Sequence, residues 1–243
     1  MINRSRVWQG CFLILLSLSA HADQKFEITS TLAELYGAER AEVYRDILKP
    51  DAKISWQVYR PSHAGGEPPG LLVYVSPTRT GTMDGRWTKV LDEYNLVYVA
   101  ANRSGNRVPV TRRMVLATSS IMAVRQQFEI DESRIYVSGF SGGGRVASFL
   151  SRQYPSVFSG AIFICGVDFW NEDVIKDMDQ VLANRYVFVS GSRDFNLNET
   201  RIVYNKYLNA GAGNSLLEIE GGMAHQLPSA KTLQAALEFL EGQ

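Results

Sequence analysis

The stretch that decides the fold reads RIYVSGFSGGGRVASFL, over residues 134–150. Its first part is an apolar run typical of a strand, and its last part has the spacing of a helix. Between them the pattern G-x-S-x-G, from Gly139 to Gly143, places Ser141 on a sharp strand-to-helix turn. Such a turn exposes the serine hydroxyl, and its neighbours must be small because strand and helix approach closely. Ser141 is therefore a candidate nucleophile, with a serine that merely caps the helix as the alternative.

Apolar runs that predict strands recur on both sides of this stretch. An alternating run covers 53–60, and short continuous runs follow at 71–75, 96–101, 134–138, 160–165, 185–190 and 215–219. Helix-like segments lie at 31–48, 109–128, 143–153, 171–183, 198–210 and 229–241. Continuous apolar strands suit a sheet that is covered on both faces. The alternation of strand and helix predicts an α/β protein with a doubly wound, mostly parallel sheet and helices on both faces.

Two further residues join Ser141 as candidates for the same site. Asp194 follows the run at 185–190, and His225 lies between the last strand-like run and the last helix. The carboxyl ends of parallel strands share one edge, so we expect these side chains to meet there. A histidine can take the proton of a serine hydroxyl and return it to a leaving group, while a carboxylate orients the imidazole. Asp168, after the run at 160–165, is an alternative acid.

In this order of serine, acid and histidine the chain resembles the α/β-hydrolase superfamily. A closer likeness rests on two stretches, which read VSGFSGGG over 137–144 and YPSVFSGA over 154–161. In these residues the chain is similar to secreted serine esterases of the polyhydroxyalkanoate-depolymerase and feruloyl-esterase type. The resemblance implies an α/β-hydrolase fold, an acyl-enzyme on Ser141 and no cofactor.

The resemblance also implies an oxyanion hole made of backbone N–H groups. One donor would be Gly142, the residue after the nucleophile, and the other would come from residues 76–81. Many relatives carry His-Gly where this chain has Ser76 and Pro77, and a proline has no N–H to give. We therefore expect Thr78 to be the second donor, with Arg79 as the alternative.

Several side chains are candidates for contact with substrate. Arg79 lies in a loop at the expected site edge, as do three other arginines: Arg86, Arg103 and Arg107. We expect Arg79 to help orient an acidic or sugar-bearing substrate, and solvated structural arginines are the alternative. Phe169 and Trp170 follow the run at 160–165 and are expected to wall the pocket, unless they are plain core residues.

The N-terminus has the pattern of a signal peptide. Arg4 and Arg6 precede a short apolar core at 11–18, and residues 20–22 read AHA, a cleavage signal. The sequence thus predicts a signal peptide over 1–22, a single domain over 23–243 and an exported protein, periplasmic or secreted. The alternative is an uncleaved anchor, although the apolar core is too short to span a bilayer and no second such stretch follows.

Composition narrows the classes of molecule that the protein is expected to bind. Removing residues 1–22 takes away two arginines and no acidic residue, so the net charge falls from 0 to −2. That balance indicates neither nucleic acid nor an anionic membrane surface as a partner. Cys165 lies in an apolar run and is expected to be a buried core residue rather than a nucleophile. The scattered histidines and cysteine predict no metal site, and the phosphate-loop pattern is absent.

The sequence therefore predicts an exported serine hydrolase. The expected activity is that of a carboxylesterase on short-acyl, aromatic or sugar-borne esters, with a small-molecule or polymer-borne ester as the partner. A serine peptidase or an acyltransferase on the same fold is the nearest alternative. A catalytically inactive hydrolase fold used for binding is the alternative from another class.

Overall fold

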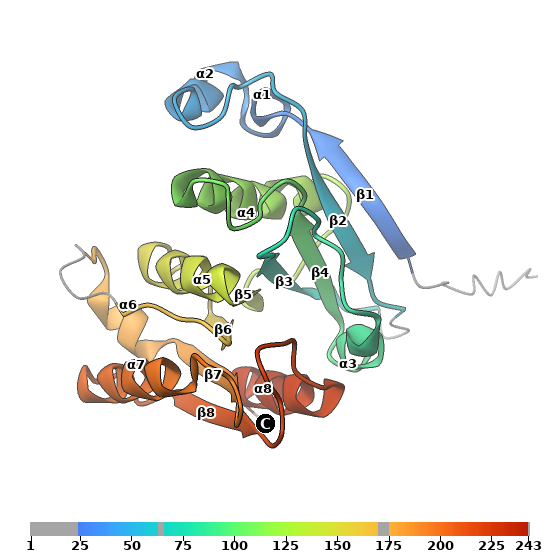
Figure 1. Cartoon of the computed structure of the whole chain (residues 1–243). Helices are drawn as coiled ribbons and strands as arrows, with labels where there is room; N and C mark the ends of the chain where they lie inside the picture. The colour runs from blue at the N-terminus through green and yellow to red at the C-terminus, as the bar shows by residue number, and fades with distance from the viewer. Residues whose placement is uncertain (1–23, 63–65, 170–174, 243) are drawn as a thin grey trace, which may run out of the picture.

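A computed structural model describes residues 24–62, 66–169 and 175–242, so the predicted signal peptide lies outside the described residues. The described chain forms one sheet in the order β1-β2-β4-β3-β5-β6-β7-β8 (Figure 1). Strands β3 to β8 run parallel, and β1 and β2 are antiparallel additions at one edge. The strands are β1 (Gln24–Ser30), β2 (Ile54–Arg60), β3 (Gly70–Val75), β4 (Leu96–Ala101), β5 (Ile135–Phe140), β6 (Gly160–Ile164), β7 (Arg185–Gly191) and β8 (Ser215–Glu220).

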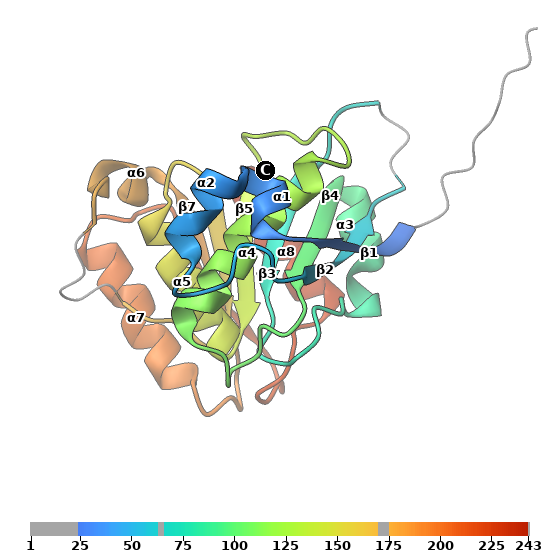
Figure 2. The same ribbon diagram turned by 90° about the horizontal axis from the view of Figure 1, so that it is seen from above.

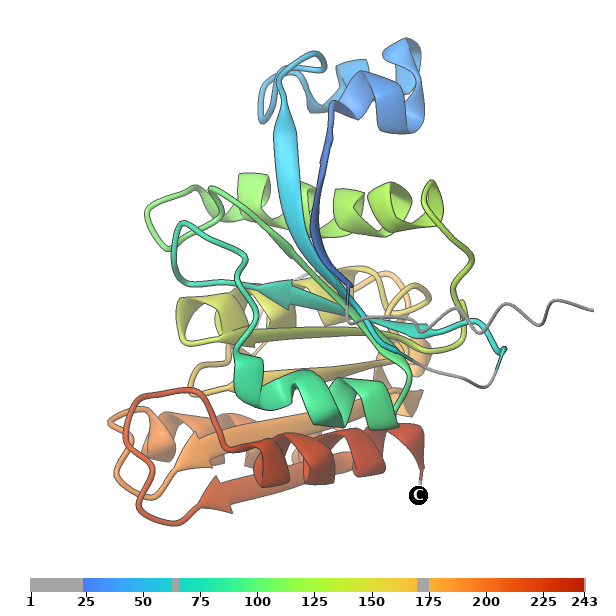
Figure 3. The ribbon, with the colours of Figure 1, turned by 90° about the vertical axis from the view of Figure 1, so that its right-hand side faces the viewer.

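Helices cover both faces of this sheet (Figures 1 and 3). One face carries α1 (Leu32–Tyr36), α2 (Ala38–Ala41), α4 (Val110–Arg125), α5 (Gly142–Gln153), α6 (Met178–Ala183) and α7 (Leu197–Asn209). The other face carries α3 (Thr88–Glu93), preceded by the 3₁₀ turn η2 (Gly85–Trp87), and α8 (Ala230–Glu241). Seen from above, α4 and α5 lie side by side along the middle of the sheet (Figure 2).

The buried strands explain the continuous apolar runs in the sequence. In β3, Leu71 and Val73 belong to the apolar layer under α4 and α5, while Leu72 and Tyr74 belong to the layer on the opposite face. A strand covered on both faces must be apolar at every position. The predicted α/β-hydrolase architecture, doubly wound and mostly parallel, is confirmed.

The structure departs from the sequence prediction at several elements. The helix expected over 171–183 is shorter, since α6 begins at Met178 and residues 171–174 lie outside the described residues. Strand β1 and helix α3 were not predicted, because β1 pairs only at the edge of the sheet and α3 is short. The helix expected over 31–48 is divided at Gly37, whose φ of 84° interrupts it. The segment 215–219 is an edge strand whose side chains are only partly buried. Among the described residues, no helix is both long and apolar enough to cross a membrane.

Candidate active site

The turn between β5 and α5 holds Ser141 in a strained backbone conformation. Its φ is 55° and its ψ is −123°, a region that a residue with a side chain rarely adopts. Glycines surround it, as the sequence predicts: a Cβ on Gly139 would lie 2.4 Å from the backbone of Gly143, and one on Gly143 would lie 1.8 Å from Val75 O. The close approach of β5, α5 and β3 thus fixes the position of the serine.

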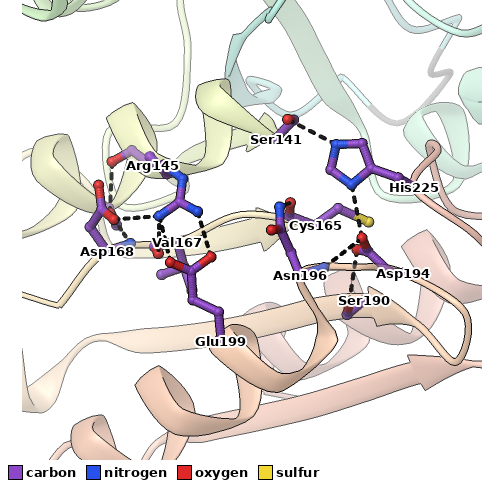
Figure 4. A network of polar contacts seen from close by, with 11 residues as sticks. Ser141, Arg145, Cys165, Val167, Asp168, Ser190, Asp194, Asn196, Glu199 and His225 are labelled. Atoms are coloured by element: carbon purple, nitrogen blue, oxygen red, sulfur yellow. Dashed lines mark hydrogen bonds and ion pairs between the residues drawn. The ribbon is translucent and has the colours of Figure 1, made fainter.

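The structure brings Ser141, His225 and Asp194 together into one hydrogen-bonded chain (Figure 4). His225 Nδ1 lies 2.8 Å from Asp194 Oδ1, and His225 Nε2 lies 2.9 Å from Ser141 Oγ. A carboxylate only accepts, so Nδ1 carries the proton and Nε2 is free to accept from the serine hydroxyl. The three residues follow β5, β7 and β8, whose carboxyl ends share one edge of the sheet.

Asp194 is held in place by several donors besides His225. Its carboxylate accepts from Asn196 N–H at 3.0 Å and from Ser190 Oγ at 3.0 Å, and the side chain is fully buried. Burial by itself would raise the pKa of Asp194, but the hydrogen bonds from Asn196, Cys165, His225 and Ser190 outweigh it and the pKa lies below its ordinary value. The carboxylate is therefore charged at neutral pH and rigidly placed.

The loop that carries His225 is tied to the loop that carries Asp194. Arg193 N–H donates to Met223 O at 3.0 Å, and Gly222 N–H donates to Ser192 Oγ at 2.8 Å. Two aromatic rings lie near the imidazole, with ring centroids 4.9 Å away for Phe140 and 4.1 Å away for Phe195.

Phe195 is 76% exposed, so an apolar surface stands beside the histidine at the mouth of the site. The sequence pattern did not single out Phe195. Its position directly after the candidate acid is the only signal that could have done so.

On the other side of Ser141 lie the groups that were expected to bind an oxyanion. Gly142 N–H, at the start of α5, has no acceptor among the described residues. Thr78 N–H donates to Ser76 Oγ at 3.1 Å, so it would have to exchange this bond to serve an oxyanion. The N–H of Arg79, the alternative donor, has no acceptor among the described residues. The roles of Thr78 and Arg79 stay predictions.

Asn106 was also missed by sequence reasoning. Its amide lies directly over Gly142: a Cβ on that glycine would lie 2.4 Å from Asn106 Oδ1 and 3.0 Å from Asn106 Nδ2. Asn106 belongs to the loop after β4, which parallel pairing brings to the same edge as the elbow. No motif in the sequence distinguishes it.

A buried arginine ties together the three segments around this side of the site. Arg113, on α4, donates from Nε to Ser104 O at 2.8 Å, from Nη1 to Gly142 O at 3.1 Å and from Nη2 to Ser76 O at 3.1 Å. Its exposed fraction is 3%. Burial lowers the pKa of Arg113 to about 10, so the guanidinium remains charged at neutral pH. The elbow and the loops after β3 and β4 therefore share one cationic clamp.

A hollow of about 500 Å³ adjoins this clamp. Its lining comes from the loop after β3 and the loop after β4: Pro77, Thr78, Arg79, Arg103, Gly105, Asn106, Arg107 and Val108. Asn106 lines the hollow and its amide also lies against Gly142, so the hollow adjoins the turn that carries Ser141. The predicted Arg79 thus lies beside the site, together with Arg103 and Arg107.

Other predicted residues lie apart from the hydrogen-bonded chain. Asp168 accepts from Arg145 Nη1 at 2.6 Å, and Glu199 is the second carboxylate of this ion-pair cluster (Figure 4). Asp168 therefore does not contact the histidine. Phe169 packs against Tyr207, with ring centroids 5.9 Å apart, and Lys206 lies over its ring. Trp170 lies outside the described residues.

One group of side chains near the site has the types that bind metals. Atoms of Cys165, Asp194 and His225 lie within 4.8 Å of one another, and no other such group was found among the described residues. Burial raises the pKa of the Cys165 thiol, which disfavours the thiolate that a metal would need. Asp194 and His225 are already hydrogen-bonded to each other. The donor set therefore fits a structural thiol better than a metal centre, and Cys165 is buried as expected.

Comparisons with known proteins agree with this fold. The protein has the α/β-hydrolase fold. Residues 109–196, a little over a third of the chain, match the sequence model of the family described as Esterase PHB depolymerase. This segment contains Ser141 and Asp194 but ends before His225. A search of curated proteins found no significant match in sequence.

Solved structures of similar fold include esterases and a related hydrolase. A fungal esterase from Rhizomucor miehei has a TM-score of 0.64 at 13% identity, over 93% of this chain and 84% of that one. A ferulic acid esterase has a TM-score of 0.61 at 15% identity, over 89% and 96%. An S-formylglutathione hydrolase from Staphylococcus aureus has a TM-score of 0.60 at 12% identity, over 89% and 94%. Together with the family match, these likenesses support a hydrolase of the esterase type.

Proposed function

We propose that the protein is an exported serine carboxylesterase. Ser141 is the nucleophile, His225 is the general base and then the general acid, and Asp194 orients the imidazole. The observation that carries this proposal is the chain of hydrogen bonds from Asp194 through His225 to Ser141 on a strained strand-to-helix turn. A serine hydroxyl becomes a competent nucleophile when a neutral imidazole can take its proton.

The reaction proceeds in two steps. The Ser141 hydroxyl gives its proton to His225 Nε2 as its oxygen attacks the ester carbonyl, and the imidazolium then protonates the departing alkoxide. Water then attacks the acyl carbonyl as it loses a proton to His225, and the imidazolium returns this proton to Ser141 Oγ as the bond to the acyl group breaks and the carboxylic acid leaves. The Gly142 N–H and a second N–H at Thr78 or Arg79 hold the oxyanion in both steps, and preorganised donors of this kind commonly contribute the largest electrostatic stabilisation.

The direct test is the Ser141→Ala variant. It should lower kcat for 4-nitrophenyl butyrate by a factor on the order of 10⁴ or more and abolish labelling by a fluorophosphonate probe, with the thermal unfolding temperature nearly unchanged. Ser156→Ala, which alters an exposed serine outside the site, is the matched control. It should keep the wild-type kcat and the labelling by the probe. An alanine variant at 141 that keeps more than about a tenth of the activity would contradict the proposal.

Export is a separate part of the proposal and rests on the N-terminal pattern. Expression of the full chain in a bacterial host should give a mature protein that starts at Asp23 and fractionates with periplasmic or secreted proteins. An intact N-terminus in the cytoplasmic fraction would refute export without affecting the esterase assignment.

A further inference from the structure

We infer that the hollow lined by residues 77–79, 103 and 105–108 is a subsite for a carboxylate on the acyl side of the ester. This inference rests on the proposed function, because it names the substrate class of the same site. The arginines of the hollow then bind substrate, in contrast to the alternative in which they are ordinary solvated side chains.

The hollow is positively charged. Its lining holds three arginines, Arg79, Arg103 and Arg107, and no acidic residue. None of the three forms an ion pair with a described residue. Arg103 also borders a second, smaller hollow that contains Glu27, so we assign the binding of the anion to Arg79 and Arg107. In a chain with equal numbers of acidic and basic residues, such a group of unpaired cations attracts an anion.

Hydrogen bonds between the two loops hold the backbone of the hollow in place. Arg103 N–H donates to Arg79 O at 2.6 Å, and Asn106 N–H donates to Pro77 O at 3.0 Å. Arg103 has a φ of 53°, a strained conformation for a residue with a side chain. The Arg113 clamp fixes the carbonyl groups at the start of both loops. The two loops are thus joined before substrate arrives, which reduces the entropy cost of binding.

The position of the hollow relative to His225 indicates which side of the ester carries the anion. The alcohol must leave toward His225, because this residue returns the proton to it. No residue that lines the hollow comes from the loops that carry Asp194 and His225. The hollow instead adjoins Gly142 through Asn106, on the oxyanion side. A group that reaches it therefore belongs to the acyl portion.

The chemistry of the lining fits a carboxylate joined to the ester by a short methylene chain. A guanidinium offers a planar pair of N–H donors that matches a carboxylate. Pro77 and Val108 provide apolar surface for the intervening carbons. Monoesters of short dicarboxylic acids have this form.

The test compares two chromogenic esters that differ only in charge, mono-4-nitrophenyl adipate and its neutral methyl ester. The wild-type protein should favour the anion in kcat/KM, and added salt should reduce this preference. The double variant Arg79→Gln/Arg107→Gln should lower the ratio of anionic to neutral kcat/KM by about tenfold and remove its salt dependence. Arg40→Gln, on exposed α2, is the matched control and should leave the ratio unchanged.

Three outcomes would overturn the inference. One is a ratio that changes less than about twofold in the double variant, and another is an equal change in Arg40→Gln. The third is a preference that appears only for 4-acetoxybenzoate over its methyl ester, which would put the anion on the alcohol side.

Binding gives a readout that does not depend on turnover. Monomethyl adipate should bind Ser141→Ala protein about tenfold more tightly than the same protein with both arginines replaced, by NMR titration. If neither ester is hydrolysed by the wild-type protein, the proposed function fails. The titration still decides the subsite.

Discussion

Replacement of Arg113 by methionine tests how much the site depends on its buried clamp. Methionine has a similar reach but donates nothing, so the carbonyl oxygens of Ser76, Ser104 and Gly142 lose their partner. A buried carbonyl left unsatisfied costs about 1–3 kcal/mol. The desolvation that lowers the pKa of Arg113 to about 10 offsets part of the loss, because the variant no longer buries a charge.

The net expectation for Arg113→Met is a loss of about 3 kcal/mol in the free energy of unfolding, which for a domain of this size lowers Tm by about 6–12 °C. Activity should also suffer, because Arg113 joins the start of the loop after β3 to the elbow. A misplacement of about 1 Å there can reduce kcat by about 100-fold.

The measurements are urea unfolding followed by circular dichroism, and kcat on 4-nitrophenyl butyrate well below Tm. The matched control is Arg125→Met on the same helix, since Arg125 is partly exposed and pairs with Glu132. It should change stability by less than about 0.5 kcal/mol. An Arg113→Met protein with wild-type Tm and kcat would refute the reasoning.

Three further predictions follow from the geometry. Asp194→Asn should lower kcat by about 10³–10⁴-fold, because the imidazole loses its correct tautomer. Asp168→Asn should lower kcat by less than about fivefold, since that carboxylate pairs with Arg145. The reverse ranking would move the acid to Asp168. The pKa of Asp194 lies below its ordinary value, so this carboxylate should stay ionised as the pH falls from neutrality to about 5. A carboxylic-acid band at about pH 5 in the infrared difference spectrum between the wild-type protein and Asp194→Asn would contradict this. Across 4-nitrophenyl esters from acetate to palmitate, kcat/KM should peak at acetate or butyrate. An uncharged acyl tail that enters the hollow would strip water from Arg79 and Arg107, and this cost offsets the gain of about 0.8 kcal/mol per buried CH₂. A peak at decanoate or longer would indicate a lipase.

The sequence alone was sufficient for the architecture and for the choice of three candidate residues. Apolar runs indicate burial on both faces of a strand, and this local pattern predicted seven of the eight strands. Strand β1 was missed because its alternation includes only two apolar residues, Phe26 and Ile28. The G-x-S-x-G motif is a weak signal by itself. It made Ser141 a candidate only together with the strand–turn–helix context and the acid and histidine that follow it.

Only the tertiary structure decided which side chains surround those candidates. Asp194 and Asp168 both follow a strand at the same edge, and the sequence does not tell which of them reaches His225. Asn106, Arg113 and Phe195 approach the site from a loop, a helix and a turn that carry no motif. Their positions depend on strand order and loop packing, which are properties of contacts between residues far apart in the chain. Local sequence patterns record burial and turns, but not which distant loops meet.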